Sequence, residues 1–109
     1  MHHTQSPEMK ACIDNCLACY RECLSAAMHH CLEIGGEHTK PRHFQLMMAC
    51  AEICRTSAHF MLLEHHKHVC RECAEICVEC ADDCERIGDM QNCVDACRRC
   101  AKSCEEMAA

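Results

Sequence analysis

Cysteine makes up sixteen of the 109 residues, and nearly every cysteine lies three or four positions from the next one. Residues at this spacing share one face of an α-helix. The runs are Cys12, Cys16, Cys19 and Cys23; Cys50 and Cys54; Cys70, Cys73, Cys77, Cys80 and Cys84; and Cys93, Cys97, Cys100 and Cys104, while Cys31 stands apart. The spacing predicts several helices, each with a stripe of thiols along one face.

Helix-start and helix-stop signals divide the chain into four predicted helices. Ser6 and Pro7 form a typical helix start, Gly35 and Gly88 are helix stops, and Asp89 is predicted to cap the last helix. The predicted helices cover roughly 7–34, 41–63, 66–87 and 90–107. Short connections place consecutive helices antiparallel. The predicted fold is all-α, an antiparallel up-down-up-down four-helix bundle with a cysteine-lined core, forming a single domain over residues 1–109.

Few large apolar residues are present to fill the core of such a bundle. Leu, Ile, Val and Phe together supply well under a fifth of the chain, which is thin for an ordinary core. Either cysteine acts as the core hydrophobe, or bound metal completes the core. These two options are compatible with each other.

The charge and the hydropathy pattern argue against several partners. The formal charge of −6 and the pI near 5.9 argue against binding to nucleic acid or to an anionic membrane surface. No apolar run approaches the length of a membrane span. Residues 1–10 lack the hydrophobic stretch of a secretory leader. The expected location is therefore the cytoplasm.

Helical-wheel positions place Cys31 apart from the other thiols of its helix. The stripe that starts at Cys12 continues through Ala26 and His30. Cys31 instead falls on a neighbouring stripe with Leu17 and Leu24, which is typical of helix–helix packing. Among the cysteines, Cys31 therefore has the least support as a metal ligand.

Methionine and histidine dominate the two ends of the thiol stripes. With alternating helix directions, one set of these residues is predicted to gather at each end of the bundle. The sets are Met9, Met61, His65, His66 and Met107 at one end, and His30, His43, Met47 and Met90 near the other. Thioether and imidazole groups suit a soft ion that enters or leaves. The alternative is that the methionines fill gaps in the core and the histidines lie on the surface.

Facing stripes of thiols favour soft metal ions over disulfides or other cofactors. A disulfide within one helix face restrains little, and disulfide scaffolds are usually loop-rich. Each Cys₄ zinc site would bring two net negative charges into the core, and the cysteine spacing of iron–sulfur sites is absent from the sequence. A Cu(I) ion replaces one thiol proton, so a one-to-one copper thiolate array is neutral. We therefore expect multiple Cu(I) ions per chain, on the order of one per cysteine, ~16 in all.

Storage is the predicted function, because a copper chaperone or sensor needs only two or three thiols. The sequence has no nucleophilic triad pattern, no phosphate loop and no paired Glu-x-x-His motif, so no enzymatic activity is expected. Three alternatives stay open: a store for zinc or another soft metal, a thiol redox protein, and an interaction module. The best redox candidate is Cys31, which lies beside His29 and His30.

The cysteine pattern resembles that of the bacterial copper storage proteins, in their cytosolic branch. The resemblance rests on the ladder from Cys12 to Cys23, the segments 50–54 and 73–77, and the run from Cys93 to Cys104. It implies a homotetramer of bundles, each of which stores many Cu(I) ions in its core and protects against copper toxicity. It leaves open whether the stored copper also supplies copper enzymes.

Two segments depart from the pattern of that family. Phe44 follows His43 where relatives often place a further cysteine, and Ala26 and Ala27 stand where the first ladder could have continued. Both departures lie toward the same end of the predicted bundle. We therefore expect fewer copper sites at that end.

Overall fold

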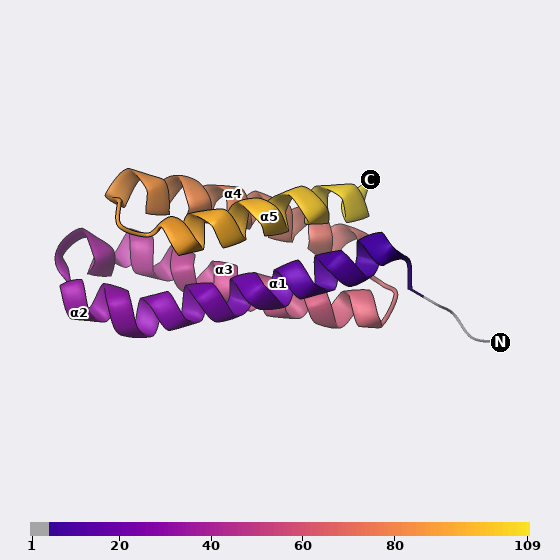
Figure 1. Ribbon diagram of the computed structural model, residues 1–109, viewed down its shortest axis with the longest axis horizontal. Coiled ribbons are helices and arrows are strands. Elements are labelled where there is room, and N and C mark those ends of the chain that lie inside the picture. Colours follow the sequence, from indigo (N-terminus) through magenta and orange to yellow (C-terminus); the bar gives the residue numbers. More distant parts are fainter. Residues whose placement is uncertain (1–4) are drawn as a thin grey trace.

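The computed structural model describes residues 5–109, which form helices joined by short turns and contain no strand (Figure 1). The elements are α1 (Pro7–Ser25), the π-helical segment η1 (Ala26–Cys31), α2 (Leu32–Ile34), the 3₁₀-helix η2 (Gly36–Thr39), α3 (Pro41–Leu62), α4 (Lys67–Ile87) and α5 (Gln91–Ala108). Because η1 joins α1 to α2 without a break, these three segments form one long rod.

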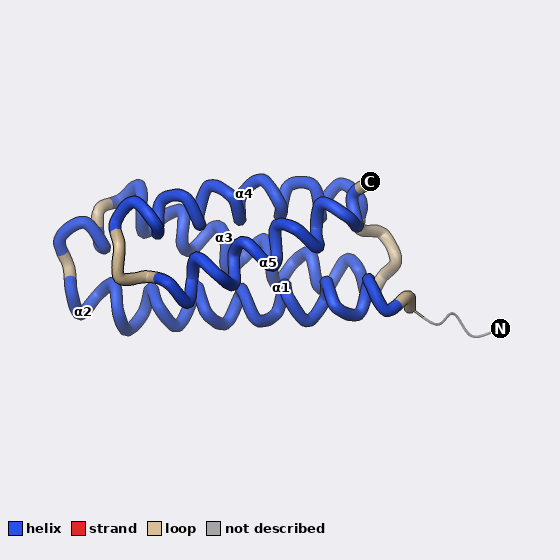
Figure 2. The backbone as a smooth tube through the Cα atoms, turned by 45° about the horizontal axis from the view of Figure 1, so that its top comes forward, coloured by secondary structure: helices blue, strands red, loops and turns tan. Residues whose placement is uncertain are grey.

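Four helical rods pack side by side around a shared core. Each rod contacts two neighbours, in the order α1, α3, α4, α5 and back to α1. Successive rods run in opposite directions along the long axis (Figure 2). The predicted antiparallel up-down-up-down bundle is therefore confirmed, and each predicted helix boundary agrees with the observed one to within one residue.

The helix termini follow the local signals of the sequence, with one exception. The Ser6 side chain accepts a hydrogen bond of 3.1 Å from the Met9 backbone N–H at the start of α1. Gly35 (φ 71°, ψ −152°) and Gly88 (φ 86°, ψ 166°) stop two of the helices. Both lie in a region of backbone space that is essentially restricted to glycine.

The exception is Asp89, which does not cap α5. The N-cap residue is Met90, and no side chain caps this helix. Asp89 itself has a left-handed backbone (φ 60°), and its carboxylate lies 3.6 Å from His30 Nε2. The predicted cap is therefore wrong, because the tight turn after Gly88 directs the Asp89 side chain toward the first rod.

The π-helical segment η1 changes which residues of the first rod face the core. In a regular α-helix Cys31 would be rotated by about 80° from Cys23. The wider i→i+5 turn of η1 absorbs an extra residue, so Ala27 and Cys31 follow Cys23 into the core and are fully buried. Ala26 and His30 are only half-buried. The prediction that Cys31 lies outside the thiol stripe is therefore wrong.

The core consists mainly of cysteine, alanine and methionine. Large apolar side chains are scarce in it, as the composition predicts, and Met47 and Met61 are among the largest that are fully buried. Within residues 5–109, no helix combines the length and the apolar character that crossing a bilayer requires.

Candidate metal centre

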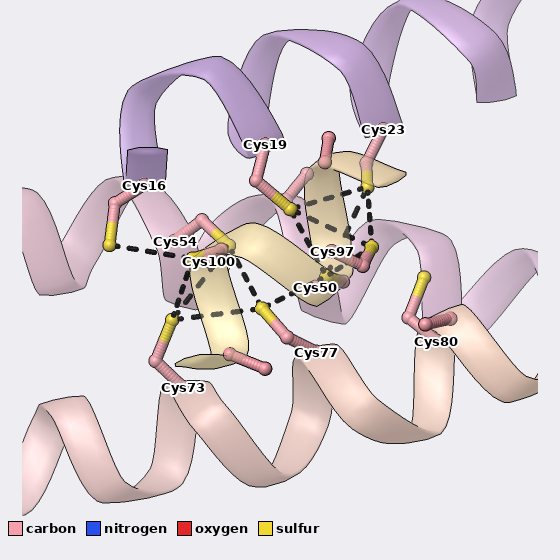
Figure 3. Close-up of a cluster of buried hydrophobic side chains, with 14 of the residues drawn as sticks. Cys16, Cys19, Cys23, Cys50, Cys54, Cys73, Cys77, Cys80, Cys97 and Cys100 are labelled. Atoms are coloured by element: carbon pink, nitrogen blue, oxygen red, sulfur yellow. Dashed lines mark hydrogen bonds between the residues drawn. The ribbon is translucent and has the colours of Figure 1, made fainter. Parts of the chain in front are cut away.

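Every cysteine side chain lies in the core of the bundle. Cys80 and Cys93 expose 1% and 2% of their surface, and the other cysteines expose none. All sixteen are free thiols. The four rods each contribute thiols to the axis, so sulfur atoms from α1, α3, α4 and α5 lie among one another in the interior (Figure 3).

Most of the thiols form one continuous network of sulfur–sulfur contacts of 3.5–4.0 Å. The members are Cys12, Cys16, Cys19, Cys23, Cys50, Cys54, Cys73, Cys77, Cys97, Cys100 and Cys104. Because neighbouring contacts share sulfur atoms, a metal ion bound at one contact can be bridged by a thiolate to the next.

Three groups of four buried thiols have all their sulfur atoms within 4.8 Å of one another. They are Cys16, Cys73, Cys100 and Cys104; Cys19, Cys54, Cys77 and Cys100; and Cys19, Cys23, Cys50 and Cys97. Adjacent groups share Cys100 or Cys19. The groups therefore form a series along the bundle rather than isolated sites.

The remaining cysteines contact other polar or sulfur-containing groups. Cys70 Sγ lies 3.4 Å from the buried hydroxyl of Ser57, and Cys93 Sγ lies 3.8 Å from the backbone oxygen of Glu22. Cys80 and Cys84 both contact Met47 Sδ, at 3.6 and 3.5 Å. Met47 thus extends the array of soft ligand atoms beyond the thiol network.

Cys31 belongs to a polar cluster at one end of the bundle, which we call the histidine end (His30, His38 and His43). Cys31 Sγ lies 3.7 Å from His43 Nε2 and 3.9 Å from Met90 Sδ. On its other side, His43 Nδ1 lies 2.8 Å from the Asp83 carboxylate, which can only accept, so Nδ1 donates.

The carboxylate that orients His43 is itself held by a cation. Arg86 Nε donates to Asp83 at 3.0 Å, and the Arg86 guanidinium also reaches Glu37 at 3.4 Å. Burial pushes the pKa of Asp83 upward, but the hydrogen bonds from His43 and Arg86 outweigh this effect and hold that pKa below its usual range. Asp83 therefore stays ionised at neutral pH and fixes the His43 ring with Nε2 toward Cys31.

The predicted gathering of His30, His43, Met47 and Met90 is realised in part by direct contacts. His43 and Met90 meet at Cys31, while Met47 lies deeper, against Cys80 and Cys84. His38 completes the cluster, since its ring centroid lies 5.2 Å from that of His30 and 6.1 Å from that of His43. His38 Nε2 is buried and has no hydrogen-bond partner among residues 5–109.

The other predicted set is more loosely arranged. The start of α1, the turn after α3 and the end of α5 meet at the same end of the bundle (Figure 1). Met61 is fully buried there, and Met9 and Met107 are half-buried against the core. His66 is half-buried and His65 is exposed, so His65 does not join the core-facing set.

The comparisons with known proteins agree with this geometry. The sequence profile of the family described as "Csp: Copper storage protein" matches residues 5–109, which is nearly the whole chain. The chain belongs to the copper storage protein family. No curated protein matches it in sequence.

Solved structures, two of them described as copper storage proteins, share the fold and between 26% and 52% of the sequence. A protein of Nitrosospira multiformis, Nmul_A1745, is 52% identical, with a TM-score of 0.90 over 93% of this chain and 94% of the other. The copper storage protein Csp3 of Bacillus subtilis in its apo form is 32% identical, with a TM-score of 0.79 over 92% and 98%. A cytosolic copper storage protein of Streptomyces lividans with five coppers is 26% identical, with a TM-score of 0.77 over 93% and 92%.

In this copper storage core, Cys31 and Cys84 favour their neutral form in the absence of metal. Burial, with a smaller contribution from Cys80, raises the pKa of the Cys31 thiol. Contact with Cys80 and Cys93, together with burial, raises the pKa of Cys84. A Cu(I) ion that displaces one thiol proton leaves the net charge of the core unchanged, so the core can fill without counter-ions.

The same burial argues against the redox alternative for Cys31. A redox-active cysteine is exposed and has a lowered pKa, whereas Cys31 is fully buried and its pKa is raised. His29 is exposed, and the imidazole that contacts the Cys31 thiol is that of His43.

Sequence reasoning missed three polar residues of the site. Ser57 occupies a core position on α3. It was missed because the cysteine spacing points only to thiols. His38 lies in η2, whose 3₁₀ geometry gives no α-helical register from which to predict burial. Asp83 directly precedes Cys84 on α4. Its bond to His43 depends on how α4 is rotated against α3, and the sequence alone does not give that rotation.

Proposed function

We propose that this protein stores Cu(I) ions as thiolate complexes in the core of its bundle and so keeps them from toxic reactions. The observation that carries the proposal is the continuous network of sulfur contacts, which runs through the interior and is buried from the surface. An array in which thiolates bridge successive ions needs this continuity, and a single-site metalloprotein does not. Storage requires no catalytic step.

The proposed ligands are the thiolates of all sixteen cysteines. They are Cys12, Cys16, Cys19, Cys23, Cys31, Cys50, Cys54, Cys70, Cys73, Cys77, Cys80, Cys84, Cys93, Cys97, Cys100 and Cys104. At the histidine end, His43 and Met90 are proposed as peripheral ligands beside Cys31, which supports this end as the mouth for copper. Imidazole and thioether groups bind a soft ion more loosely than thiolate does, which suits transfer.

The setting of this function follows from the family. The Streptomyces lividans relative is described as cytosolic, and we propose the same location for this protein. We further propose that residues 1–109 act as one four-helix domain and that such domains assemble into a homotetramer. The support for the single domain is that all four rods contribute to one core.

Anaerobic titration of the fully reduced protein with Cu(I) tests the proposal. The titration is run against a competing chromophoric chelator, after the free thiols have been counted. We expect tight uptake of many ions per chain, on the order of one per cysteine. Saturation at four ions or fewer would refute storage, and the elution volume of the same sample reports whether the chain is tetrameric.

A further inference from the structure

In one of the three four-cysteine groups, the sulfur atoms are almost equally spaced, which an array of bridged copper ions does not require. The sulfur atoms of Cys19, Cys23, Cys50 and Cys97 make all six possible pairwise contacts, at distances between 3.6 and 4.0 Å. These four atoms are therefore the vertices of a nearly regular tetrahedron in the core, where side chains of three helices meet (Figure 3). In the other two four-thiol groups, some of the pairs make no such contact.

The size of this tetrahedron matches a particular metal geometry. A regular tetrahedron with edges near these distances has its centre about 2.3 Å from each vertex, and about 2.3 Å is the Zn–S bond length in structural zinc sites. Zn(II) takes four ligands in tetrahedral geometry and accepts four cysteine thiolates. The ligands come from α1, α3 and α5, so their positions are already fixed by helix packing.

We propose that the copper-free protein binds one Zn(II) ion at Cys19, Cys23, Cys50 and Cys97, and that this ion is released when copper loads the core. The zinc site differs from the copper array in three ways. It holds a single ion, that ion is divalent, and each of its thiolates binds one metal ion rather than bridging two. Zinc binding by the copper-free protein goes beyond storage of Cu(I) and does not depend on it, whereas release of the zinc ion rests on the proposed copper loading.

The charge of the site limits zinc to a single position in this part of the core. Four thiolates around Zn(II) carry two net negative charges, which are costly to bury. Neighbouring thiols reduce this cost, because Cys77 Sγ lies 3.7 Å from Cys50 Sγ and can donate its S–H once Cys50 is ionised. The adjacent four-thiol group also uses Cys19, so a zinc ion at the tetrahedron excludes another in that group.

Exchange with copper balances in atoms and charge without any redox step. The four thiolates give up one Zn²⁺ and accept four Cu⁺, so the net charge at these residues changes from −2 to zero. No proton moves in this exchange, because the thiolates are already ionised in the zinc form. Relief of the buried charge therefore favours the copper form.

The test is a titration of the reduced, copper-free protein with Zn(II) against a chromophoric chelator, with Co(II) as a spectroscopic substitute for zinc. The variant is Cys50→Ser, and the matched control is Cys31→Ser, because both thiols are fully buried but only Cys50 belongs to the tetrahedron. Cys97→Ser is a second test variant in case Cys50→Ser does not fold, and circular dichroism of the metal-free proteins establishes folding.

We expect wild type and Cys31→Ser to bind one Zn(II) per chain, and their Co(II) forms to show the intense absorption of a tetrahedral thiolate site. Cys50→Ser and Cys97→Ser should lose at least about tenfold in zinc affinity. Addition of Cu(I) to the zinc form should release one Zn²⁺ per chain. An octahedral Co(II) spectrum, absence of zinc binding, or equal affinity in Cys50→Ser and Cys31→Ser would overturn the proposal. Cu(I) capacity is measured separately on zinc-free protein, so the two proposals can fail independently.

Discussion

At the scale of single residues, two adjacent aspartates of α4 have very different surroundings. Asp83 is 14% exposed and bonds to the buried His43 ring, whereas Asp82 is 64% exposed and pairs with Arg98 at the surface. A charged hydrogen bond to a buried group contributes more to stability than a solvated ion pair does. Asp83 is therefore an anchor between α3 and α4, and Asp82 is its natural control.

We predict that Asp83→Asn lowers the free energy of unfolding of the copper-free protein by about 1–3 kcal/mol, while Asp82→Asn changes it by less than about 0.5 kcal/mol. Because the pKa of Asp83 is lowered in the folded state, its contribution is present above the unfolded value of about 3.9 and is lost as pH falls through the folded value. Urea unfolding at pH 7 and below pH 4 measures both effects. Equal stability of the two variants at pH 7 would contradict this account.

At the scale of secondary structure, η1 determines how the first rod presents its thiols. Seven residues span about two α-helical turns, whereas eight do not. Cys31 lies eight positions after Cys23 and still reaches the core, because the π-helical turn accommodates one extra residue. The extra residue is on the solvent side, where Met28 and His29 are exposed.

Deletion of His29 should therefore convert η1 to a regular α-helix and leave Cys31 in the core. We expect this variant to fold with stability similar to that of wild type and to keep all its thiols unreactive toward a thiol reagent. Deletion of the exposed Ala18 is the matched control, since it rotates Cys19 and every later residue of the rod by about 100°. If the two deletions destabilise the protein equally in urea, η1 does not have this role.

The same segment shows where the sequence sufficed and where it did not. The three- and four-residue spacing of the cysteines correctly predicted the four rods. It also predicted the burial of residues such as Cys12, Cys54 and Cys100, because they lie in uninterrupted α-helix. The placement of Cys31 outside the thiol stripe was wrong, since no residue type specifies a π-helical turn. The bond between His43 and Asp83 joins two helices, and their relative rotation cannot be derived from either sequence stripe alone.

At the scale of the whole molecule, the thiols couple folding to pH. The pKa values of Cys31, Cys84 and Cys93 are raised in the folded protein. A raised folded pKa gives stability that is complete below the unfolded value of about 8.5 and is lost as pH rises through the folded value. The unfolded chain then releases thiol protons that the copper-free bundle retains.

We predict that the copper-free protein becomes less stable above about pH 8.5, by about 1.4 kcal/mol per pH unit for each thiol that ionises only on unfolding. Urea midpoints between pH 7 and 9.5, in the presence of a reductant, test this slope. The copper-loaded protein is the control and should show little loss over the same range, because its thiolates are already bound. A flat profile for the copper-free protein would contradict the prediction.

Copper should also be distributed unevenly along the bundle. Near the histidine end, Ala27, Met47 and Met90 occupy core positions between the cysteines, and Phe44 is half-buried beside them. We therefore expect fewer Cu(I) sites there than in the thiol network. Crystallographic occupancies after Cu(I) loading measure this, and full sites beside Phe44 would contradict it.

A cysteine introduced at the histidine end tests the same distribution by gain of capacity. Ala27→Cys places a thiol at a fully buried position and should add about one Cu(I) ion per chain. Ala26→Cys is the control, because Ala26 is only half-buried at the edge of the core, and it should add none. Equal gains would mean that position along the chain, rather than orientation, determines capacity.

Complete burial of the thiols also has a kinetic consequence. Since no cysteine exposes more than 2% of its surface in the copper-free protein, an arriving ion must wait until the helices open locally. When capture is faster than reclosure, the loading rate becomes independent of copper concentration and equals the opening rate of the bundle. Mild heating or a low concentration of urea should then accelerate filling, even though each weakens the fold that holds the copper.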